Sequence, residues 1–320
     1  MNRSHQFLVI ILVFVLAISS SCHALVSSAK ITIKVMNEDG SPVEGARVGI
    51  GFDDYRNRNK ENSVVGLSND NGLFSGSAAT TSGAIGFNIT KQGYYKSTGE
   101  YLFKEKKLLR WQPWNQEIRI VLRKIGNPVP MYARKVTAIL PAVNKEIGFD
   151  LFHADWVAPY GAGSMADFNA SLKADDSGPD DFEYKVTIKF NGKMNGVYEV
   201  TDNILTGSSY KLPRLANEEG YQKSLNLMWR GLKRGQKRTW NQNRHYIYRV
   251  RAEENDGRLL RAMYGKIVSD VRIASNRREG KLPSIEFTYY LNPDYTRNLE
   301  FDTKHNLFGE LPDLEKIRQP

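Results

Sequence analysis

Apolar and polar residues alternate with a period of two along much of this chain, and this alternation constrains its fold more than any other feature. It is clearest in residues 182–190, where polar residues separate five apolar ones: Phe182, Tyr184, Val186, Ile188 and Phe190. Successive side chains of a β-strand point to opposite faces, so the pattern predicts a half-buried strand. Asn191-Gly192, which follows it, is typical of a hairpin turn.

The same alternation predicts strands along the rest of the chain, at residues 31–35, 43–50, 85–89, 117–123, 225–229, 244–252, 258–274 and 285–291. The turn sequence Asn255-Asp256-Gly257 predicts that the strands on either side of it pair with each other. The sequence predicts no helix longer than two turns. We therefore expect an all-β protein with two tandem β-sandwich domains.

A length of 320 residues is enough for two domains, each with its own core. Lys124–Pro130 contains two prolines and a glycine within five positions, which favours an extended linker. The expected organisation is a signal peptide at 1–24, a first sandwich at 25–126, a linker at 127–135, a second antiparallel sandwich at 136–291 and an irregular C-terminal tail at 292–320.

The N-terminal segment predicts export. Arg3 precedes Phe7–Ile18, a run of twelve apolar residues that is shorter than the ~20 residues needed to span a bilayer. Cleavage after Ala24 would remove Cys22; alternatively, Ser20-Ser21-Cys22 resembles a bacterial lipoprotein box and Cys22 becomes lipidated. Both outcomes place the protein in the periplasm, at the cell surface or outside the cell. We expect no transmembrane helix.

Charge and cysteine content exclude several classes of site. A single Cys allows neither an intramolecular disulfide nor a four-Cys zinc site. The net charge is +10, and removing the predicted signal peptide with its one base leaves +9. Export argues against nucleic acid as the partner of these bases. The candidate partners are an anionic envelope polymer, a glycan, lipid headgroups or another protein, but simple solubility is the favoured explanation of the charge.

One group of turn and core residues resembles a known family. The pattern is Val35-x-x-x-Asp39-Gly40-x-Pro42-Val43-x-Gly45-Ala46-x-Val48, then Asn69-Asp70-Asn71-Gly72-x-Phe74, then Gly93-Tyr94. Over residues 30–125 it resembles the carboxypeptidase regulatory-like domain, a transthyretin-like β-sandwich found in exported bacterial proteins. The resemblance implies a structural or adhesive module. The remainder, with its segment Asp155–Gly161, resembles uncharacterised exported bacterial proteins and implies no activity.

The sequence predicts no enzyme. None of its five His residues is followed by Glu three positions later, so the zinc motif of a carboxypeptidase is missing. His153 and Asp155 would share one face of a strand and could form an acid–base pair. Ser164 lacks the glycines of a nucleophile elbow. A hydrolase with paired carboxylates remains as a third hypothesis, because sequence cannot place two acids at the required separation.

Three groups of residues could bind a ligand. The segment 230–251 contains eight bases and interleaved aromatics but no acid, which favours an anion site or, alternatively, a solvated hairpin: Arg230, Lys233, Arg234, Lys237, Arg238, Arg244, Arg249 and Arg251. An acidic loop could bind Ca²⁺ or could simply be solvated: Asp175, Asp176, Asp180 and Asp181. Trp111 and Trp114 could stack on sugar rings or could cover the end of the sandwich.

Taken together, the sequence predicts an exported, non-enzymatic binding or structural protein of the bacterial cell envelope that contacts an anionic partner. The alternative is a carbohydrate-binding accessory protein of a polysaccharide-handling system. No cofactor is expected beyond Ca²⁺.

Overall fold

The computed structural model describes residues 26–53, 62–178, 181–203, 205–232 and 235–320. It is an all-β protein, as predicted, and its one helical element is the 3₁₀ turn η2 (Arg277–Glu279) within those ranges. The chain divides into two compact units, which we call unit 1 (up to Leu122) and unit 2 (from Arg123). The predicted signal peptide and Cys22 lie outside the described residues. No helix within the described ranges is long and apolar enough to cross a membrane.

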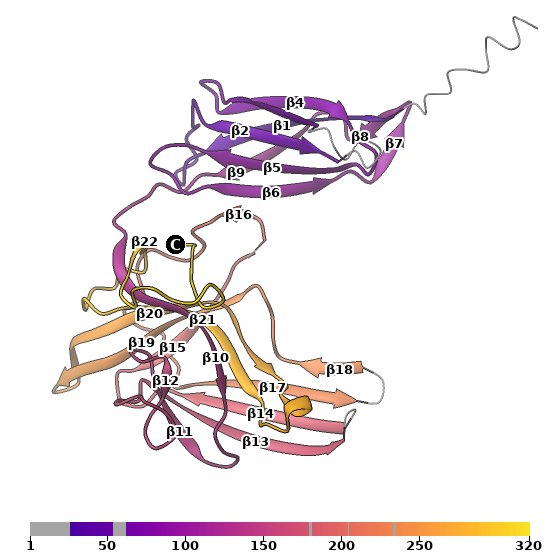
Figure 1. Ribbon diagram of the computed structural model, residues 1–320. Helices are drawn as coiled ribbons and strands as arrows, with labels where there is room; N and C mark the ends of the chain where they lie inside the picture. Colours follow the sequence, from indigo (N-terminus) through magenta and orange to yellow (C-terminus); the bar gives the residue numbers. More distant parts are fainter. Residues whose placement is uncertain (1–25, 54–61, 179–180, 204, 233–234) are drawn as a thin grey trace, which may run out of the picture. The chain divides into compact units, whose positions relative to one another are not determined.

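Unit 1 consists of two packed sheets (Figure 1). The first has the order β4-β1-β8-β7, with β9 also parallel to β1: β1 (Ser28–Met36), β4 (Leu73–Ala79), β7 (Glu105–Lys107), β8 (Arg110–Gln112) and β9 (Gln116–Val121). The second is antiparallel in the order β6-β5-β2-β3: β2 (Arg47–Phe52), β3 (Ser63–Leu67), β5 (Ala84–Thr90) and β6 (Ser97–Leu102).

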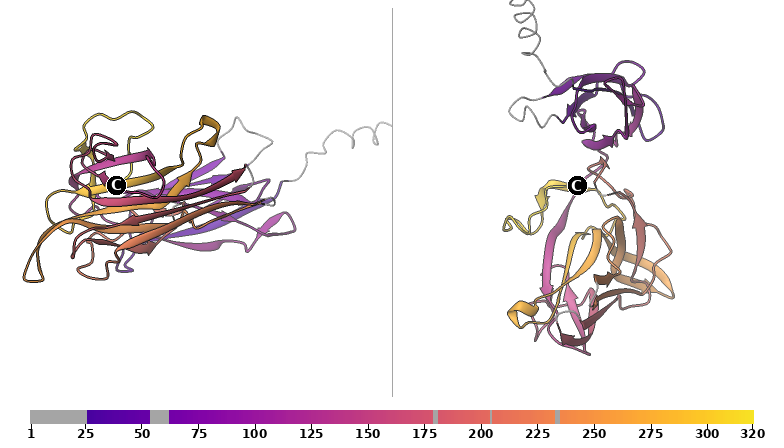
Figure 2. Two further views of the ribbon diagram at one scale, coloured as in Figure 1. Left: turned by 90° about the horizontal axis from the view of Figure 1, so that it is seen from below. Right: turned by 90° about the vertical axis from the view of Figure 1, so that its right-hand side faces the viewer.

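The core of unit 1 follows the period-two pattern. Ile31, Ile33 and Val35 of β1 are fully buried, and the predicted apolar face of β5 packs against the same cluster. The right-hand view of Figure 2 shows the strands of this unit end on, enclosing that core. Gly72 has a φ of +73°, and a Cβ there would lie 2.3 Å from the Val35 carbonyl oxygen. Only glycine therefore fits this predicted turn.

Unit 2 contains two six-stranded sheets. One, the β19 sheet, has the order β15-β19-β20-β21-β10-β22: β10 (Val129–Ile139), β15 (Gly196–Thr201), β19 (Arg244–Asn255), β20 (Arg258–Ala274), β21 (Ser284–Asn292) and β22 (Phe301–Asn306). The other, the β14 sheet, has the order β12-β11-β13-β14-β17-β18: β11 (Glu146–Asp150), β12 (Asp155–Trp156), β13 (Phe168–Gly178), β14 (Asp181–Lys189), β17 (Ser224–Leu232) and β18 (Gly235–Arg238). A short strand, β16 (Gly207–Ser208), also belongs to unit 2.

The two sheets of unit 2 share one hydrophobic core. The four alternating apolar residues of β14 and Phe190, which directly follows it, are all buried there, together with Tyr246, Tyr248 and Val250 of β19. The predicted pairing of the strands around Asn255-Asp256-Gly257 is confirmed, since β19 and β20 are antiparallel neighbours. The opposite face of the β19 sheet is covered as well, because Ile247 is fully buried in a second cluster with Tyr264 and Leu299.

Two expectations about the ends of unit 2 are wrong. The segment 127–135 is not an extended linker, because β10 begins at Val129 and pairs with β21 inside the sheet. The tail after residue 291 is not wholly irregular, because β22 adds a parallel edge strand to β10. The buried carboxylate of Glu300 fixes this junction by accepting hydrogen bonds from the backbone N–H groups of Gly126 and Asn127, both at 2.8 Å.

Candidate anion-binding pocket

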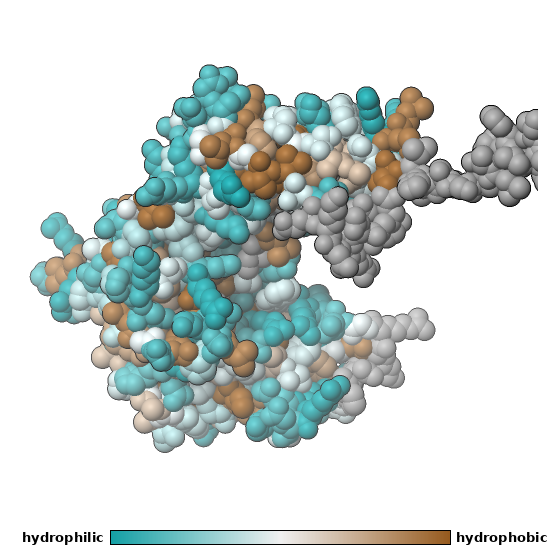
Figure 3. All heavy atoms as spheres, turned by 45° about the horizontal axis from the view of Figure 1, so that its top comes forward, coloured by the Kyte–Doolittle hydropathy of each residue, from teal (hydrophilic) through white to brown (hydrophobic). Residues whose placement is uncertain are grey.

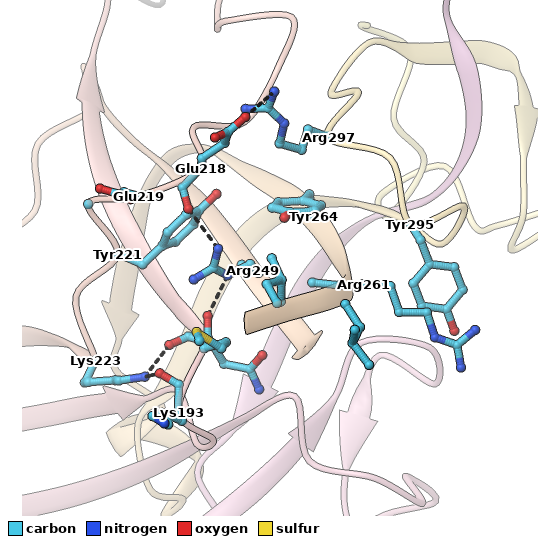
Figure 4. Close-up of a pocket in the computed structure, with 16 residues that line it drawn as sticks. Lys193, Glu218, Glu219, Tyr221, Lys223, Arg249, Arg261, Tyr264, Tyr295 and Arg297 are labelled. Atoms are coloured by element: carbon cyan, nitrogen blue, oxygen red, sulfur yellow. Dashed lines mark hydrogen bonds and ion pairs between the residues drawn. The ribbon is translucent and has the colours of Figure 1, made fainter. Parts of the chain in front are cut away.

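A pocket of about 640 Å³ opens in unit 2 on the face of the β19 sheet that points away from its main core. Its walls come from five places: the turn before β15, the segment before β17, the strands β19 and β20, and the loop after β21 (Figure 4). Five bases and two acids line it, so the lining side chains carry a formal charge of +3: Lys193, Lys223, Arg249, Arg261, Arg297, Glu218 and Glu219.

Arg249 of β19 lies at the base of this pocket. Its side chain is buried, with its guanidinium 4.3 Å from the ring centroid of Tyr221. Nε donates to the Met194 carbonyl oxygen at 2.5 Å, and Nη1 donates to the Glu218 carbonyl oxygen at 2.9 Å. These bonds fix the guanidinium in place, and its hydrogen-bond acceptors within the described ranges are both backbone carbonyl oxygens.

Lys223 is a second cation of the pocket lining, and it is exposed. Its Nζ donates to three backbone carbonyl oxygens at 2.6–2.8 Å, those of Gly192, Lys193 and Asn195. Desolvation, followed by the charge of Arg249, lowers the pKa of Lys223, and the charge of Glu254 opposes this. Neither Lys223 nor Arg249 forms an ion pair within 4.0 Å with any acid among the described residues. The two cations repel each other and contribute positive potential to the pocket.

The bases around the mouth of the pocket form exposed ion pairs. Arg297 contacts Glu218 at 3.0 Å, and Arg261 contacts Glu253 at 2.7 Å. Arg261 also lies over the ring of Tyr295, 4.6 Å from its centroid (Figure 4). Exposed pairs of this kind contribute only about 0–1 kcal/mol each. An incoming anion can therefore compete for these bases at little cost.

The lining combines charged side chains with aromatic rings. Among the described residues it contains no Ser, Thr, Cys, His or Asp, so it offers neither a Ser- or Cys-type nucleophile nor an imidazole base. One of its two carboxylates, that of Glu218, is paired with Arg297. Tyr221, Tyr264 and Tyr295 supply apolar rings beside the charges. Such a mixture can hold a ligand that is both anionic and partly apolar.

The six bases of segment 230–251 that the structure describes do not form one site. Only Arg249 lies in the pocket, and the side chain of Arg251 is largely buried between Asp167 at 2.7 Å and Asp150 at 3.0 Å. Arg244 lies 3.4 Å from Glu199 and 3.6 Å from Asp270.

Three more of these bases lie on the β17–β18 hairpin, where Arg230 faces Lys237 across the strands and Arg238 stacks on Trp229 at 4.1 Å. Lys233 and Arg234 lie outside the described residues. The prediction of a single basic patch is wrong, because the three arginines of β19 lie in separate places. One lines the pocket, and the other two lie close to different carboxylates.

The His153–Asp155 pair does not exist. The Nδ1 atom of His153 lies 2.8 Å from Asp150, whereas Asp155 accepts hydrogen bonds from the backbone N–H groups of Trp156 and Ala162. Residues 151–154 form a turn, so the alternation of a strand does not apply to His153. Its side chain instead contacts a residue three positions earlier in the chain.

The buried pair Asp150 and Asp167 serves structure. Burial would raise the pKa of Asp150, but hydrogen bonds from the backbone of Ser164 and Met165 outweigh it and hold that pKa well below its usual range. Burial prevails at Asp167 and raises its pKa despite the hydrogen bond from Arg251. Both carboxylates are occupied by Arg251, so they do not form the free acid pair that a hydrolase requires.

The burial of Trp111 contradicts its predicted stacking role. Trp111 of β8 packs into the core of unit 1, donates from Nε1 to the Thr80 carbonyl oxygen at 3.1 Å and is covered by Lys106. Trp114 is half-buried, with the guanidinium of Arg110 4.9 Å from its ring centroid. A stacking role for Trp114 alone stays a prediction.

The predicted calcium loop is instead the end of a hairpin. β13 continues to Gly178 and β14 begins at Asp181, so Asp175 and Asp181 belong to strands, while Asp180 lies outside the described residues. Asp176 is already occupied: it pairs with Arg277 at 2.5 Å and accepts the Tyr184 hydroxyl at 2.7 Å. Across the described ranges, no group of three or more His, Cys, Asp or Glu residues is placed to hold a metal ion.

No family model and no curated protein matches this chain. Among solved structures, 3-chlorocatechol 1,2-dioxygenase from Rhodococcus opacus 1CP is 10% identical over 33% of this chain and 63% of its own, with a TM-score of 0.28. This chain therefore spans less than two thirds of that enzyme. The shaft pilin SpaA from Lactobacillus rhamnosus GG is 13% identical over 53% of this chain and 90% of its own, with a TM-score of 0.23. A DUF3823 family protein from Parabacteroides merdae is 9% identical over 87% of this chain and 100% of its own, with a TM-score of 0.21. Scores this low carry no argument about function.

Proposed function

We propose that this chain is an exported, non-enzymatic binding protein of the bacterial cell envelope, whose unit 2 pocket receives an acidic group of an envelope polysaccharide. One observation carries the proposal: the buried Arg249 and the exposed Lys223 line one pocket, and neither forms an ion pair within 4.0 Å with an acid among the residues that the structure describes. The apolar signal segment Phe7–Ile18 supports export.

The ligand class follows from the chemistry of the lining. A carboxylate or sulfate placed near Lys223 and Arg249 would offset the repulsion between them, and the bases at the mouth would attract further negative charge. Tyrosine rings next to charged groups suit the apolar faces of sugar rings. The volume of about 640 Å³ lies within the common range for small-ligand pockets. An acidic sugar combines both features.

Unit 1 would serve as a spacer or adhesive module. The support for this is its β-sandwich of short strands and the turn pattern by which it resembles the carboxypeptidase regulatory-like domain. Its residues in that pattern, such as Gly72 and Val43, are turn and core positions. They therefore point to a scaffold rather than to chemistry.

The test compares an acidic oligosaccharide with a neutral partner of the same shape. We would titrate the chain with an oligogalacturonate and with its methyl ester by calorimetry, at low and high salt. Binding of the acid alone, weakened by salt, is expected. Lys193→Gln and Arg261→Gln should each weaken it about threefold to fivefold, as loss of an exposed charge does.

Lys237→Gln is the matched control, because it removes one charge from the β17–β18 hairpin, outside the pocket. It should leave the affinity unchanged. Equal binding of the acid and its ester, or an equal loss in Lys237→Gln, would refute the pocket as the anion site.

A further inference from the structure

The tip of the β7–β8 hairpin in unit 1 exposes two leucines. Leu108 is 97% exposed and Leu109 is 45% exposed, and they form the two-residue connection between Lys107 and Arg110. Figure 3 shows hydrophobic atoms at this end of unit 1, over the hairpin. Leu108 therefore buries almost no surface within the chain, and both leucines are available to an apolar partner.

The backbone of this turn is unfavourable for leucine. Leu108 has a φ of 44° and Leu109 a φ of 62°. Two consecutive positive φ angles are what a type I′ hairpin turn requires, and Asn-Gly normally supplies them. A branched side chain in this region carries strain, and such strain is a reason to look for function at the site. The turn thus retains apolar side chains where a polar pair would fold better.

A collar of positive charge surrounds these leucines. Residues 104–110 are all exposed, and four of the seven are basic against the single acid Glu105: Lys104, Lys106, Lys107 and Arg110. Long basic side chains can lie along an apolar surface while their charged ends reach outward to anionic headgroups. Half-buried Trp114, beneath Arg110, is the type of residue that occupies the boundary between lipid and water.

The start of the described chain lies beside the same tip. The backbone N–H of Ser28 donates to the Leu109 carbonyl oxygen at 2.9 Å, and Ser28 pairs with Arg110. Cys22 precedes Ser28 by six residues, which an extended chain spans in about 20 Å. A lipid on Cys22 would therefore hold this hairpin within reach of the bilayer that carries it.

We propose that the β7–β8 tip is a membrane-contact site, which inserts Leu108 and Leu109 into a bilayer while its collar of bases binds anionic headgroups. An apolar tip with a basic collar matches the acyl chains and the anionic headgroups of a bilayer surface. A soluble polyanion would contact the bases but would leave the leucines in water. Shallow insertion of this kind gives weak, reversible binding, so it works with an anchor rather than in place of one.

A fluorescent probe at the tip tests the insertion directly. The chain that remains after the predicted cleavage, residues 25–320, contains every described strand and no cysteine. Leu108→Cys labelled with a nitrobenzoxadiazole dye should shift to the blue on vesicles of 70% phosphatidylcholine and 30% phosphatidylglycerol. The same dye on Leu314→Cys, an 89% exposed position in unit 2, should not shift. No shift at position 108, or an equal shift at both positions, would overturn the proposal.

Substitutions separate insertion from charge. The double variant Leu108→Asn with Leu109→Gly should fold, because Asn-Gly suits the turn, and its partition onto these vesicles should fall at least about tenfold. Lys104→Gln and Lys107→Gln should each weaken binding about fivefold, and only on vesicles with phosphatidylglycerol. Lys237→Gln on unit 2 should have no effect. An unchanged partition of the double variant would refute insertion; an unchanged salt and lipid dependence of the lysine variants would refute the collar.

Discussion

Replacing Arg251 with Met should destabilise unit 2 more than any exposed arginine substitution. Its Nε lies 2.7 Å from Asp167 and its Nη2 lies 3.0 Å from Asp150, and these two carboxylates are 0% and 1% exposed. Removing one partner of a buried ion pair leaves an uncompensated charge and costs about 3–5 kcal/mol. Methionine keeps part of the side-chain volume and its contact with Phe152. The loss of unfolding free energy therefore arises mainly from the removed charge rather than from a cavity.

The stability difference between parent and variant should change with pH in a direction that follows from the pKa values of the two carboxylates. In the variant, Asp167 has lost its cation, so burial raises its folded pKa further above that of the unfolded chain, whereas hydrogen bonds from the backbone of Ser164 and Met165 still lower the pKa of Asp150. At Asp167 the folded variant therefore binds more protons than the unfolded chain above about pH 4 and gains stability as the pH falls. The depressed pKa of Asp150 acts in parent and variant alike, so it does not alter the difference between them. The difference between them should therefore shrink from pH 7 to pH 4.5.

Equilibrium urea unfolding at both pH values measures the effect. Arg261→Met is the matched control, because the same substitution there breaks an exposed pair with Glu253, whose side chains are 53% and 51% exposed; it should cost no more than about 1 kcal/mol. Adding Asp167→Asn to Arg251→Met should recover about 1–2 kcal/mol by removing one stranded charge. Equal losses in the two methionine variants, or a difference that grows at acidic pH, would refute the reasoning.

Three further changes test other parts of the structure by urea unfolding. Burial lowers the pKa of Lys266 to about 7, while the unfolded amine titrates near 10.4; Lys266→Met should therefore raise the unfolding free energy by up to about 5 kcal/mol at pH 6, and the gain should shrink towards pH 10. Gly265→Ala would place a Cβ 2.3 Å from the Tyr248 ring and should cost more than about 2 kcal/mol. Leu108→Asn with Leu109→Gly should stabilise unit 1 by about 1–2 kcal/mol.

The sequence predicted those features of the fold that neighbouring residues determine. The five alternating apolar residues in and directly after β14 are buried as their alternation required, and the Asn255-Asp256-Gly257 turn pairs β19 with β20. Both follow from local chemistry, the pleat of a strand and the φ angles of a turn. The start of β10 within the predicted linker was not predicted, because Pro130 argues against a strand: proline donates no ladder hydrogen bond, yet β10 contains it near its start.

What covers a sheet could not be predicted, because that depends on segments distant in sequence. The alternation in β19 placed His245 on the polar face, and polar faces usually meet water. In the structure His245 is fully buried; its Nδ1 accepts the backbone N–H of Ser269, and its Nε2 donates to the Asp202 carbonyl oxygen at 3.1 Å. Sequence alternation identifies the two faces of a strand but not their surroundings.

The misplaced basic cluster has a more specific cause in β19. In a regular strand, Arg249 and Arg251 would share one face and one site. Here the register with β20 shifts between Val250 and Glu253, and Arg251 itself has a φ of 50°. This irregularity turns Arg251 towards Asp150 and Asp167, while Arg249 keeps the face that forms the pocket. β-bulges commonly re-aim one side chain in this way, and arginine carries no sequence signal for a positive φ. One of the two arginines thus forms an internal ion pair and the other lines a pocket, and the backbone conformation between them determines which side chain takes which position.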